Sequence, residues 1–196
     1  MIRTLLPIVE GHSEVIGVPV LLRRLLINLG HPEVLIARPF RVKRNQVVLS
    51  GELERALLQG IQTRTEVTGI LVILDADDDD PDELETSLAK RCHAASAKPT
   101  AVVTARREME SWFLGSKDSL RGVCGIRADA KAPEAPESIR GAKERLTRNM
   151  EGDRCYVEVK DQPVMAAKMD LDLALQRCPS FQRLFAELER LLVEIS

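Results

Sequence analysis

The sequence predicts an α/β protein with a mainly parallel sheet, helices on both faces and a mainly helical C-terminal extension. Strand-like and helix-like segments alternate through the first hundred residues or so, the pattern typical of a parallel sheet. The segment GILVIL, residues 69–74, is apolar at every position, which indicates a central strand buried on both faces. Beyond Gly115 the strand signals fade and helical periodicity predominates.

The periodicity of apolar residues predicts the strands and helices of the core in order. Two of them contain prolines. Pro7 is unusual inside a strand and predicts an irregular or edge position. Pro19 predicts that its helix kinks or begins near that point. Strands are predicted at 4–9, 33–40, 69–74 and 100–104, and helices at 13–29, 52–64, 82–95 and 109–114.

The second half is predicted to be less regular. Residues 116–137 are rich in Gly, Ala and Pro and are expected to form a mobile loop. A helix at 138–149, a strand-like CYVEV at 155–159 and two further helices follow, the last one strongly amphipathic. We therefore expect a core over 1–115, a linker over 116–137 and an extension over 138–196 that packs on the core.

Composition narrows the classes of function. The chain has 196 residues and a net charge of −2, which excludes a strongly basic nucleic-acid binder but not an enzyme whose metal supplies positive charge. Its four cysteines have no paired spacing that would predict a zinc site. Scattered cysteines, with no signal-peptide-like or membrane-spanning apolar segment, predict a cytoplasmic protein without a membrane partner.

Acidic residues follow three of the predicted strands. The carboxyl ends of parallel strands meet at one edge of a sheet, so these side chains are expected to converge there. Carboxylates are the ligands that Mg²⁺ prefers, and Mn²⁺ is the alternative ion. Gly11 would let the backbone approach a bound phosphate closely. The candidates for metal ligands are Glu10, Asp75, Asp77, Glu108 and Glu110, and Glu14 lies one helical turn beyond Glu10.

Each of these acids also has an ordinary structural interpretation. An acid before a glycine is usual in a turn, and Glu14 is suitably placed to cap a helix. Most of the acidic run 78–85 is typical of a helix beginning beside Pro81. Asp75 and Asp77 favour the metal interpretation, because two like charges at the end of a core strand repel and need a cation. Spaced two apart in an extended strand end, they would point the same way.

A basic stretch, RPFRVKR, follows the second predicted strand. It is a candidate for contacts with a nucleic-acid backbone, and a solvated loop that balances nearby acids explains it equally well. The four basic residues are Arg38, Arg41, Lys43 and Arg44.

Two acidic motifs resemble the Toprim domain, which occurs in topoisomerases, bacterial primases and nucleases of the overcoming-lysogenization-defect group. They are IVEGHSE at 8–14 and ILVILDADDD at 70–79. Segments at 18–26, 107–115 and 160–184 are also similar to an uncharacterised bacterial family of Toprim-like proteins. The resemblance covers most of the chain and implies a Toprim/Rossmann-like fold.

The resemblance implies phosphodiester chemistry with Mg²⁺. The expected reaction is metal-assisted hydrolysis of a nucleic acid, and the expected nucleic acid is DNA. The position of Glu10 implies a general acid/base or metal-linked role, and those of Asp75 and Asp77 imply metal ligands. Glu14 matches the second acid of a Glu-x-x-x-Glu pattern and is a candidate catalytic residue.

The related nucleases also use a later acid and a lysine. Glu108 or Glu110 is the candidate for the acid, and Lys160 or Lys168 for the lysine. The chain differs from topoisomerases, because its single tyrosine, Tyr156, has no recognisable catalytic context. It also lacks the ATPase domain that many such nucleases carry, which leaves open a stand-alone nuclease, a separate ATPase subunit and a homo-oligomer.

Other classes are less well supported. The sequence has no GxxxxGK[ST] motif, so it is not a P-loop ATPase. A haloacid-dehalogenase-like phosphatase would carry its Asp-x-Asp pair on the first strand. Here Asp75 and Asp77 follow a later strand, which disfavours this class. The remaining alternative is a non-catalytic Toprim-like partner or regulatory subunit of an ATPase-containing complex, in which the last helix and the 116–137 segment form an assembly interface.

Overall fold

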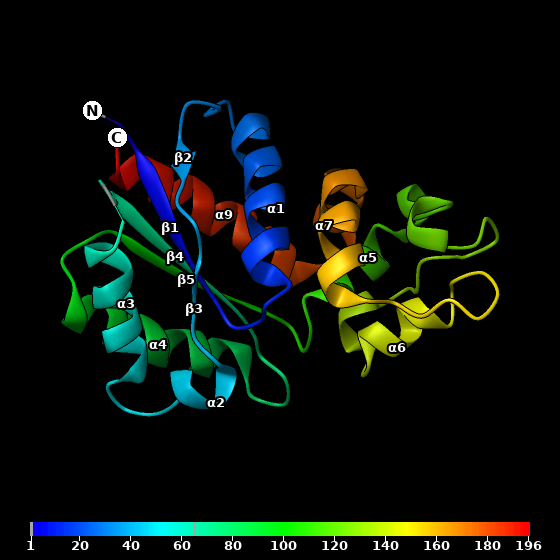
Figure 1. The fold of residues 1–196 in the computed structure, drawn as a ribbon, viewed down its shortest axis with the longest axis horizontal. Coiled ribbons are helices and arrows are strands. Elements are labelled where there is room, and N and C mark those ends of the chain that lie inside the picture. Colours follow the sequence, from blue (N-terminus) through cyan, green and yellow to red (C-terminus); the bar gives the residue numbers. More distant parts are fainter. Residues whose placement is uncertain (1, 65) are drawn as a thin grey trace.

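The computed structural model describes residues 2–64 and 66–196 and confirms the predicted α/β class. Its sheet has five strands, all parallel, in the order β2–β1–β4–β5, with β3 also pairing with β1 (Figure 1). As predicted, β4, which is apolar up to its last residue, is interior. The strands are β1 (Thr4–Val9), β2 (Leu35–Ile36), β3 (Phe40–Arg41), β4 (Gly69–Asp75) and β5 (Thr100–Ala105).

Helices cover both faces of the sheet. Side chains alternate along each strand, so Leu71 and Val103 pack beneath α1 and α9, whereas Val72 and Val102 pack against α3 and α4. The longer helices are α1 (Glu14–Asn28), α3 (Glu52–Gln62), α4 (Pro81–Ala95), α7 (Glu158–Lys168) and α9 (Pro179–Glu194). The shorter ones are α2 (Arg44–Val47), α5 (Glu110–Gly115), α6 (Ala142–Thr147) and α8 (Leu171–Arg177).

The second predicted strand, 33–40, is two short strands instead of one. β2 and β3 both pair with β1, and residues 37–39 between them form no strand. Pro39 lies in this interruption and has no N–H to donate to a ladder. The chain then turns directly into α2, a helix that periodicity did not predict.

Pro7 lies in an interior strand, so the prediction of an edge position is wrong. The carbonyls of Leu5 and Val9 point towards β2 and β3 and accept the N–H groups of Ala37 and Val42, both at 2.8 Å. Pro7 lies two residues from each and points to the same side, opposite the gap between β2 and β3. An N–H at this position would have no strand partner, so the proline removes no hydrogen bond from the sheet.

Pro19 does not interrupt its helix. α1 begins at Glu14 and continues through Pro19 to Asn28. Its buried residues include Val18, Leu21 and Leu22, which pack on the sheet on both sides of the proline in sequence. Tertiary packing therefore offsets the single helical hydrogen bond that Pro19 cannot make.

The second half differs from the prediction in its helices. The helix expected at 138–149 is only α6, and the strand expected at 155–159 is the approach to α7. The Asp161 carboxylate accepts the Val157 N–H at 2.8 Å and so favours the start of a helix there. Three helices follow, α7, α8 and α9, where two were expected.

The segment 116–137 is also more structured than predicted. It contains short 3₁₀ helices, and the side chains of Lys117, Leu120, Ile126 and Ala130 are buried. They contribute to the interior of the helical part. The segment is therefore not simply a loop over the surface.

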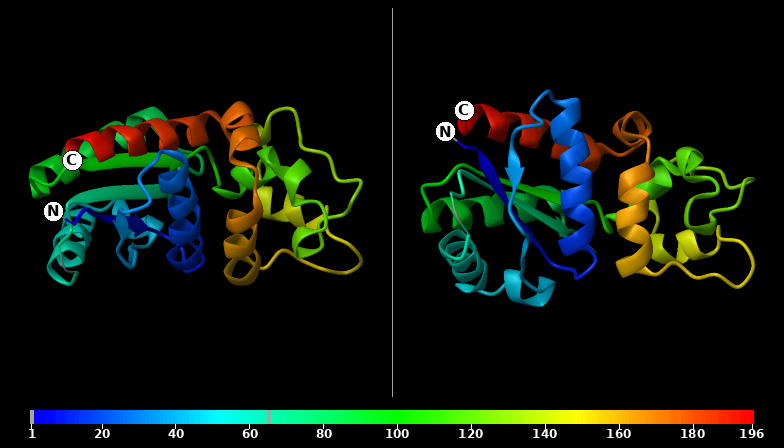
Figure 2. Two further views of the ribbon diagram at one scale, coloured as in Figure 1. Left: turned by 90° about the horizontal axis from the view of Figure 1, so that it is seen from above. Right: turned by 45° about the horizontal axis from the view of Figure 1, so that its top comes forward.

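The helical part of the second half, which includes α5, α6 and α7, lies beyond the carboxyl ends of the strands (Figures 1 and 2). α7 packs along α1, and α9 runs back along β5 towards the N-terminus. The edge of the sheet at which the predicted acids converge is thus closed from the side by helices. Within the residues described, none of the helices has the length and apolar character needed to cross a bilayer.

Candidate metal centre

Three carboxylates meet at the carboxyl edge of the sheet. Glu10 follows β1, Glu14 begins α1 and Asp75 ends β4. One carboxylate oxygen from each lies within 4.8 Å of the other two. We call Glu10, Glu14 and Asp75 the acid cluster.

The Glu14 side chain is held by the turn between β1 and α1. Its carboxylate accepts the backbone N–H groups of Glu10 at 3.0 Å and Gly11 at 3.2 Å. A Cβ on residue 11 would lie 2.7 Å from Glu14 Oε1, so glycine leaves room for the Glu14 carboxylate. Burial of Glu14 raises the pKa of its carboxyl, although these two hydrogen bonds oppose the rise.

Asp75 is the most deeply buried member of the cluster. One of its carboxylate oxygens accepts the Met109 N–H at 2.8 Å, which ties the end of β4 to the segment before α5. Burial raises its pKa well above the ordinary value, and the neighbouring charges of Glu110, Glu14 and Glu10 raise it further. An ionised Asp75 therefore needs a compensating positive charge.

Glu10 has an oxygen with no hydrogen-bond partner. Its Oε2 is buried, and no donor among the described residues reaches it. Burial, followed by Glu14 and Asp77, raises the pKa of Glu10 to about 7. A buried, unpartnered carboxylate oxygen beside two more carboxylates fits a divalent cation that prefers hard oxygen ligands, such as Mg²⁺ or Mn²⁺.

Glu110 lies beside the acid cluster, and its charge acts on Asp75. It is 1% exposed and accepts the Tyr156 hydroxyl at 2.9 Å and Gln162 Nε2 at 3.4 Å. Burial raises the pKa of Glu110 to about 7, whereas Lys143 and Tyr156 lower it. The hydrogen bonds with α7 and the segment before it fix this fourth acid in place.

Lys143 supplies positive charge to this group of acids. Its Nζ lies 3.2 Å from Glu158 Oε1. Burial disfavours its charged form, but Glu110, Glu158 and Asp75 outweigh this and raise its pKa above the ordinary lysine value. Lys143 therefore remains protonated throughout the neutral range.

Asp77 does not join the acid cluster. β4 ends at Asp75, and Asp77 has a left-handed backbone with a φ of 52°. The rule that alternate residues of a strand point the same way therefore does not apply to it. Its side chain is 58% exposed and lies 3.7 Å from Arg44 Nε.

Glu108 has a structural place outside the acid cluster. Its carboxylate accepts the backbone N–H groups of Ala142 at 3.1 Å and Lys143 at 3.4 Å, at the start of α6. The two lysines suggested for the site, Lys160 and Lys168, are both exposed on α7. Lys168 lies ten residues after Glu158, or about 15 Å along the helix, so it does not reach the centre.

The basic stretch divides into two parts. Arg44 is fixed next to the acid cluster, where it donates to the Asp75 carbonyl at 3.2 Å and pairs with Asp79. Arg38 and Arg41 instead line a surface groove together with His12. Lys43 is exposed just before α2.

Sequence reasoning missed Lys143, Glu158 and the role of Tyr156. All three lie in the second half of the chain, beyond the predicted linker, and no spacing relates them to the strand ends. Tyr156 was noted only as the single tyrosine, and Glu158 follows it by two residues. For Lys143 the sequence contains no comparable signal.

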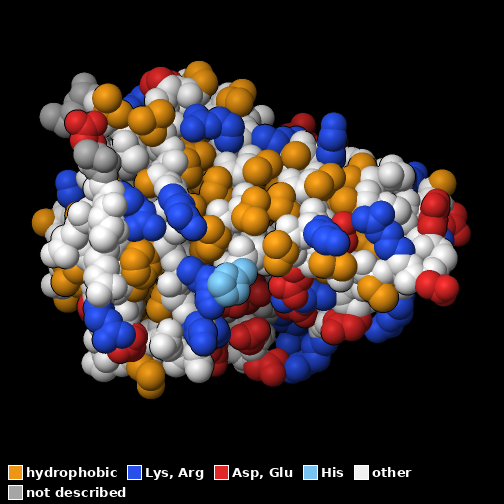
Figure 3. Space-filling view, in the orientation of Figure 1, with side chains coloured by type: hydrophobic (Ala, Val, Ile, Leu, Met, Phe, Trp, Pro, Cys, Tyr) orange, Lys and Arg blue, Asp and Glu red, His pale blue; other side chains and the backbone are white. Residues whose placement is uncertain are grey.

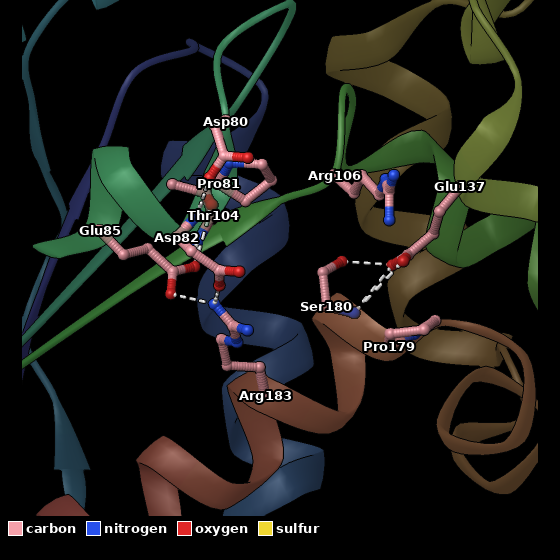
Figure 4. A pocket seen from close by; sticks show the side chains of 10 residues that line it. All are labelled: Asp80, Pro81, Asp82, Glu85, Thr104, Arg106, Glu137, Pro179, Ser180 and Arg183. Atoms are coloured by element: carbon pink, nitrogen blue, oxygen red, sulfur yellow. Dashed lines mark hydrogen bonds and ion pairs between the residues drawn. The ribbon is translucent and has the colours of Figure 1, made fainter.

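A separate pocket of about 160 Å³ lies between α4, α9 and the end of β5 (Figure 4). Most of its polar side chains bind one another. Arg183 pairs with Asp82 and Glu85 at 2.5 and 2.6 Å, and Glu137 accepts the Ser180 N–H at 3.1 Å and the Ser180 hydroxyl. These contacts hold α9 to the rest of the protein and do not include the acid cluster.

A parallel α/β sheet with clustered, largely buried carboxylates at its carboxyl edge defines an α/β protein with a candidate divalent-metal centre. The chain belongs to the family described as Domain of unknown function (DUF4276), whose model matches residues 9–189. It is similar to a solved structure of the C-terminal region of the Xanthomonas campestris pv. campestris OLD protein. The two are 11% identical with a TM-score of 0.47, over 97% of this chain and 96% of that one. A comparison with curated proteins finds no match.

Proposed function

We propose that this protein is a Mg²⁺- or Mn²⁺-dependent phosphodiester hydrolase that acts on nucleic acid. The observation that carries the proposal is the acid cluster, in which three carboxylates converge and Glu10 Oε2 lies buried without a hydrogen-bond partner. The resemblance of 8–14 and 70–79 to Toprim motifs supports it, because those motifs contain all three acids.

Glu10, Glu14 and Asp75 would hold the ion, with Glu110 next to them. When bound, the ion supplies charge stabilisation for a scissile phosphate and lowers the pKa of a water molecule. The packing of α7 along α1 places Glu158 and the Glu110 partner Gln162 beside the cluster. The chain also orients Asp75 through the Met109 N–H and Glu14 through the two N–H groups of the β1–α1 turn.

Lys143 has the charge and position to stabilise the phosphate during hydrolysis. Its ammonium group pairs with Glu158 and lies within the field of Asp75 and Glu110. As the P–O bond breaks, negative charge accumulates on the phosphate oxygens, and a fixed cation stabilises this charge more than that of the ground state. We therefore assign to Lys143 the role that the resemblance gives to a lysine.

Metal binding and cleavage test this proposal. Calorimetry should show Mn²⁺ binding to the wild-type protein and a loss of affinity well beyond tenfold in Asp75→Asn. Asp78→Asn is the matched control, because Asp78 is 68% exposed and pairs with Arg140 outside the cluster. It should stay within about twofold of wild type.

The same three proteins are then incubated with plasmid, linear duplex and single-stranded DNA in Mg²⁺ or Mn²⁺. Cleavage by wild type and Asp78→Asn, but not by Asp75→Asn, supports the proposal. Equal activity in all three proteins, or cleavage that persists in EDTA, would overturn it. An associated ATPase subunit and self-association remain predictions.

A further inference from the structure

A groove of about 590 Å³ runs beside the metal centre and combines two kinds of surface. Arg38 and Arg41 line it, and His12 lies at the same place. Its apolar wall includes Ile16 of α1 and Val159 of α7. Positive charge and exposed apolar surface therefore share one depression in the protein surface.

The two arginines are available to a ligand. Among the residues that the structure describes, neither Arg38 nor Arg41 forms an ion pair. Arg64, which also lines the groove, is different. Its guanidinium donates to the carbonyls of Arg38 at 2.6 Å and Pro39 at 3.1 Å, and it lies 5.3 Å from the centre of the Phe40 ring. Arg64 thus shapes the groove and leaves Arg38 and Arg41 to contact a ligand.

The apolar wall is exposed to water. Ile16 is 48% exposed and Val159 is 52% exposed, and their helices α1 and α7 pack side by side. Figure 3 shows hydrophobic side chains gathered over this part of the molecule, with Lys and Arg side chains around them. A contiguous apolar surface with a basic rim is typical of a binding site.

The groove adjoins the acid cluster. Arg41 in β3 is the register partner of Val9, the residue before Glu10. His12 lies two residues beyond Glu10, and Val159 follows Glu158, the partner of Lys143. A polymer in the groove would therefore pass next to the metal centre.

We propose that this groove binds a single-stranded segment of nucleic acid, with phosphates on Arg38 and Arg41 and unstacked bases against Ile16 and Val159. This inference rests on the proposed function, because it takes the polymer cut at the metal centre to be the one in the groove. A duplex presents its phosphates outside and keeps its base faces stacked, so it would leave the apolar wall without a partner. A single strand offers both surfaces at once.

Fluorescence anisotropy in EDTA tests the groove without any contribution from the metal. The probes are a labelled 20-nucleotide single-stranded DNA and the duplex of the same sequence. Wild type should bind the single strand at least about tenfold more tightly than the duplex, because only unstacked bases can cover the apolar side chains of Ile16 and Val159. Equal affinity for the two probes would overturn the proposal.

Variants separate the two surfaces of the groove. The double variant Arg38→Ala with Arg41→Ala should weaken binding and reduce the slope of log affinity against log salt by about 1.4, or about 0.7 for each phosphate that an arginine no longer neutralises. Ile16→Ser with Val159→Ser should weaken single-strand binding without changing that slope. Lys90→Ala, an exposed cation on α4 at the opposite face of the sheet, is the control and should bind as wild type does.

Failure of this inference can be told apart from failure of the proposed function. Groove variants that bind the oligonucleotide as wild type does would overturn the inference, whether or not the protein binds Mn²⁺ and cleaves DNA. Displacement of the oligonucleotide by an equal concentration of polyglutamate would also overturn it and assign the groove to an acidic protein. Loss of Mn²⁺ binding with intact groove binding would count only against the metal centre.

Discussion

The Glu108 carboxylate accepts the backbone N–H of Lys143 and thereby fixes the start of the helix that carries this lysine to the acid cluster. Gly141, the residue before α6, has no side chain with which to cap the helix, so Glu108 provides the cap from a distant part of the chain. An acid that sequence reasoning offered as a metal ligand thus positions the cation of the site.

Replacing Glu108 by alanine should reduce cleavage while leaving metal binding intact. Loss of the cap costs about 0.5–2 kcal/mol of stability in α6 and lets Lys143 move. We expect kcat to fall less than in Lys143→Ala, where loss of the cation costs about 10²–10³-fold. Calorimetry with Mn²⁺ should give the wild-type affinity for Glu108→Ala. A tenfold loss of affinity in Glu108→Ala would place Glu108 among the ligands instead.

Metal affinity should rise with pH. The pKa values of Glu10 and Glu110 are both about 7, so these carboxyls are mostly protonated at pH 6, and Glu10 must lose its proton before it binds a cation. We expect Mn²⁺ affinity to increase by at least about tenfold between pH 6 and pH 8. Calorimetry in buffers of different ionisation enthalpy would count the protons released. Binding that does not depend on pH would contradict this prediction.

The same pKa values predict how the metal-free protein responds to pH. Folding raises the pKa of Glu10 and Glu110 from 4.5, so the stability that their protonated forms contribute is complete below about pH 4.5 and is lost as pH rises through about 7. The melting temperature in EDTA should fall between pH 5 and pH 8, and Mg²⁺ should restore it. In Glu10→Gln this fall should be smaller. An unchanged pH profile in that variant would rule Glu10 out as the cause.

Gly11→Ala should impair metal binding more than folding. The new Cβ would lie 2.7 Å from Glu14 Oε1 and would displace that carboxylate from the cluster. Residue 11 lies outside the left-handed region, so alanine fits its backbone. We expect at least a tenfold loss of Mn²⁺ affinity, with a change in melting temperature of only a few degrees. Gly30→Ala is a useful comparison, because a Cβ there meets nothing within 4 Å but its φ of 79° is strained for alanine. That variant should lose stability and keep its metal affinity.

Tyr156→Phe tests how much the hydrogen bond from the Tyr156 hydroxyl to Glu110 stabilises the protein. The phenolic hydroxyl donates to Glu110 Oε1 at 2.9 Å in a buried site, and its loss leaves that oxygen with only the 3.4 Å contact from Gln162. The free energy of unfolding should fall by about 1–3 kcal/mol. Urea titration measures this change, and Tyr156→Phe should retain cleavage activity. Complete loss of cleavage in a folded variant would give the tyrosine a direct part in the reaction.

The sheet could be predicted from the sequence because buried parallel strands leave a clear local signal. The apolar run at 69–74 indicated an interior strand, and the run at 4–9 indicated a strand that Pro7 wrongly suggested to be at an edge; the acids directly after both strands were candidates for that reason. Glu10 and Asp75 meet because both strands end at the same edge. Asp77, also predicted as a ligand, lies outside the acid cluster, because the strand ends at Asp75 and the left-handed backbone of Asp77 breaks the alternation on which the prediction rested.

The rest of the site depends on contacts between distant segments. Lys143 is fixed by Glu108 at the start of its helix and by Glu158 at the start of α7, and neither contact has a sequence pattern. The CYVEV segment alternates like a strand, but Val157 and Val159 are exposed and Asp161 favours a helix there. Local periodicity could not reveal which of these tendencies prevails.

The run of α9 along β5 has a consequence for the timing of folding during synthesis. β5 ends at Ala105 and α9 begins at Pro179, about 74 positions later. A ribosome adding about 5–20 residues per second needs roughly 4–15 s to translate that interval. During this time Ala101 and Val103 have no covering helix, although β5 has already been made. One face of β5 is therefore covered late, when α9 leaves the exit tunnel and packs on a strand that was made long before it.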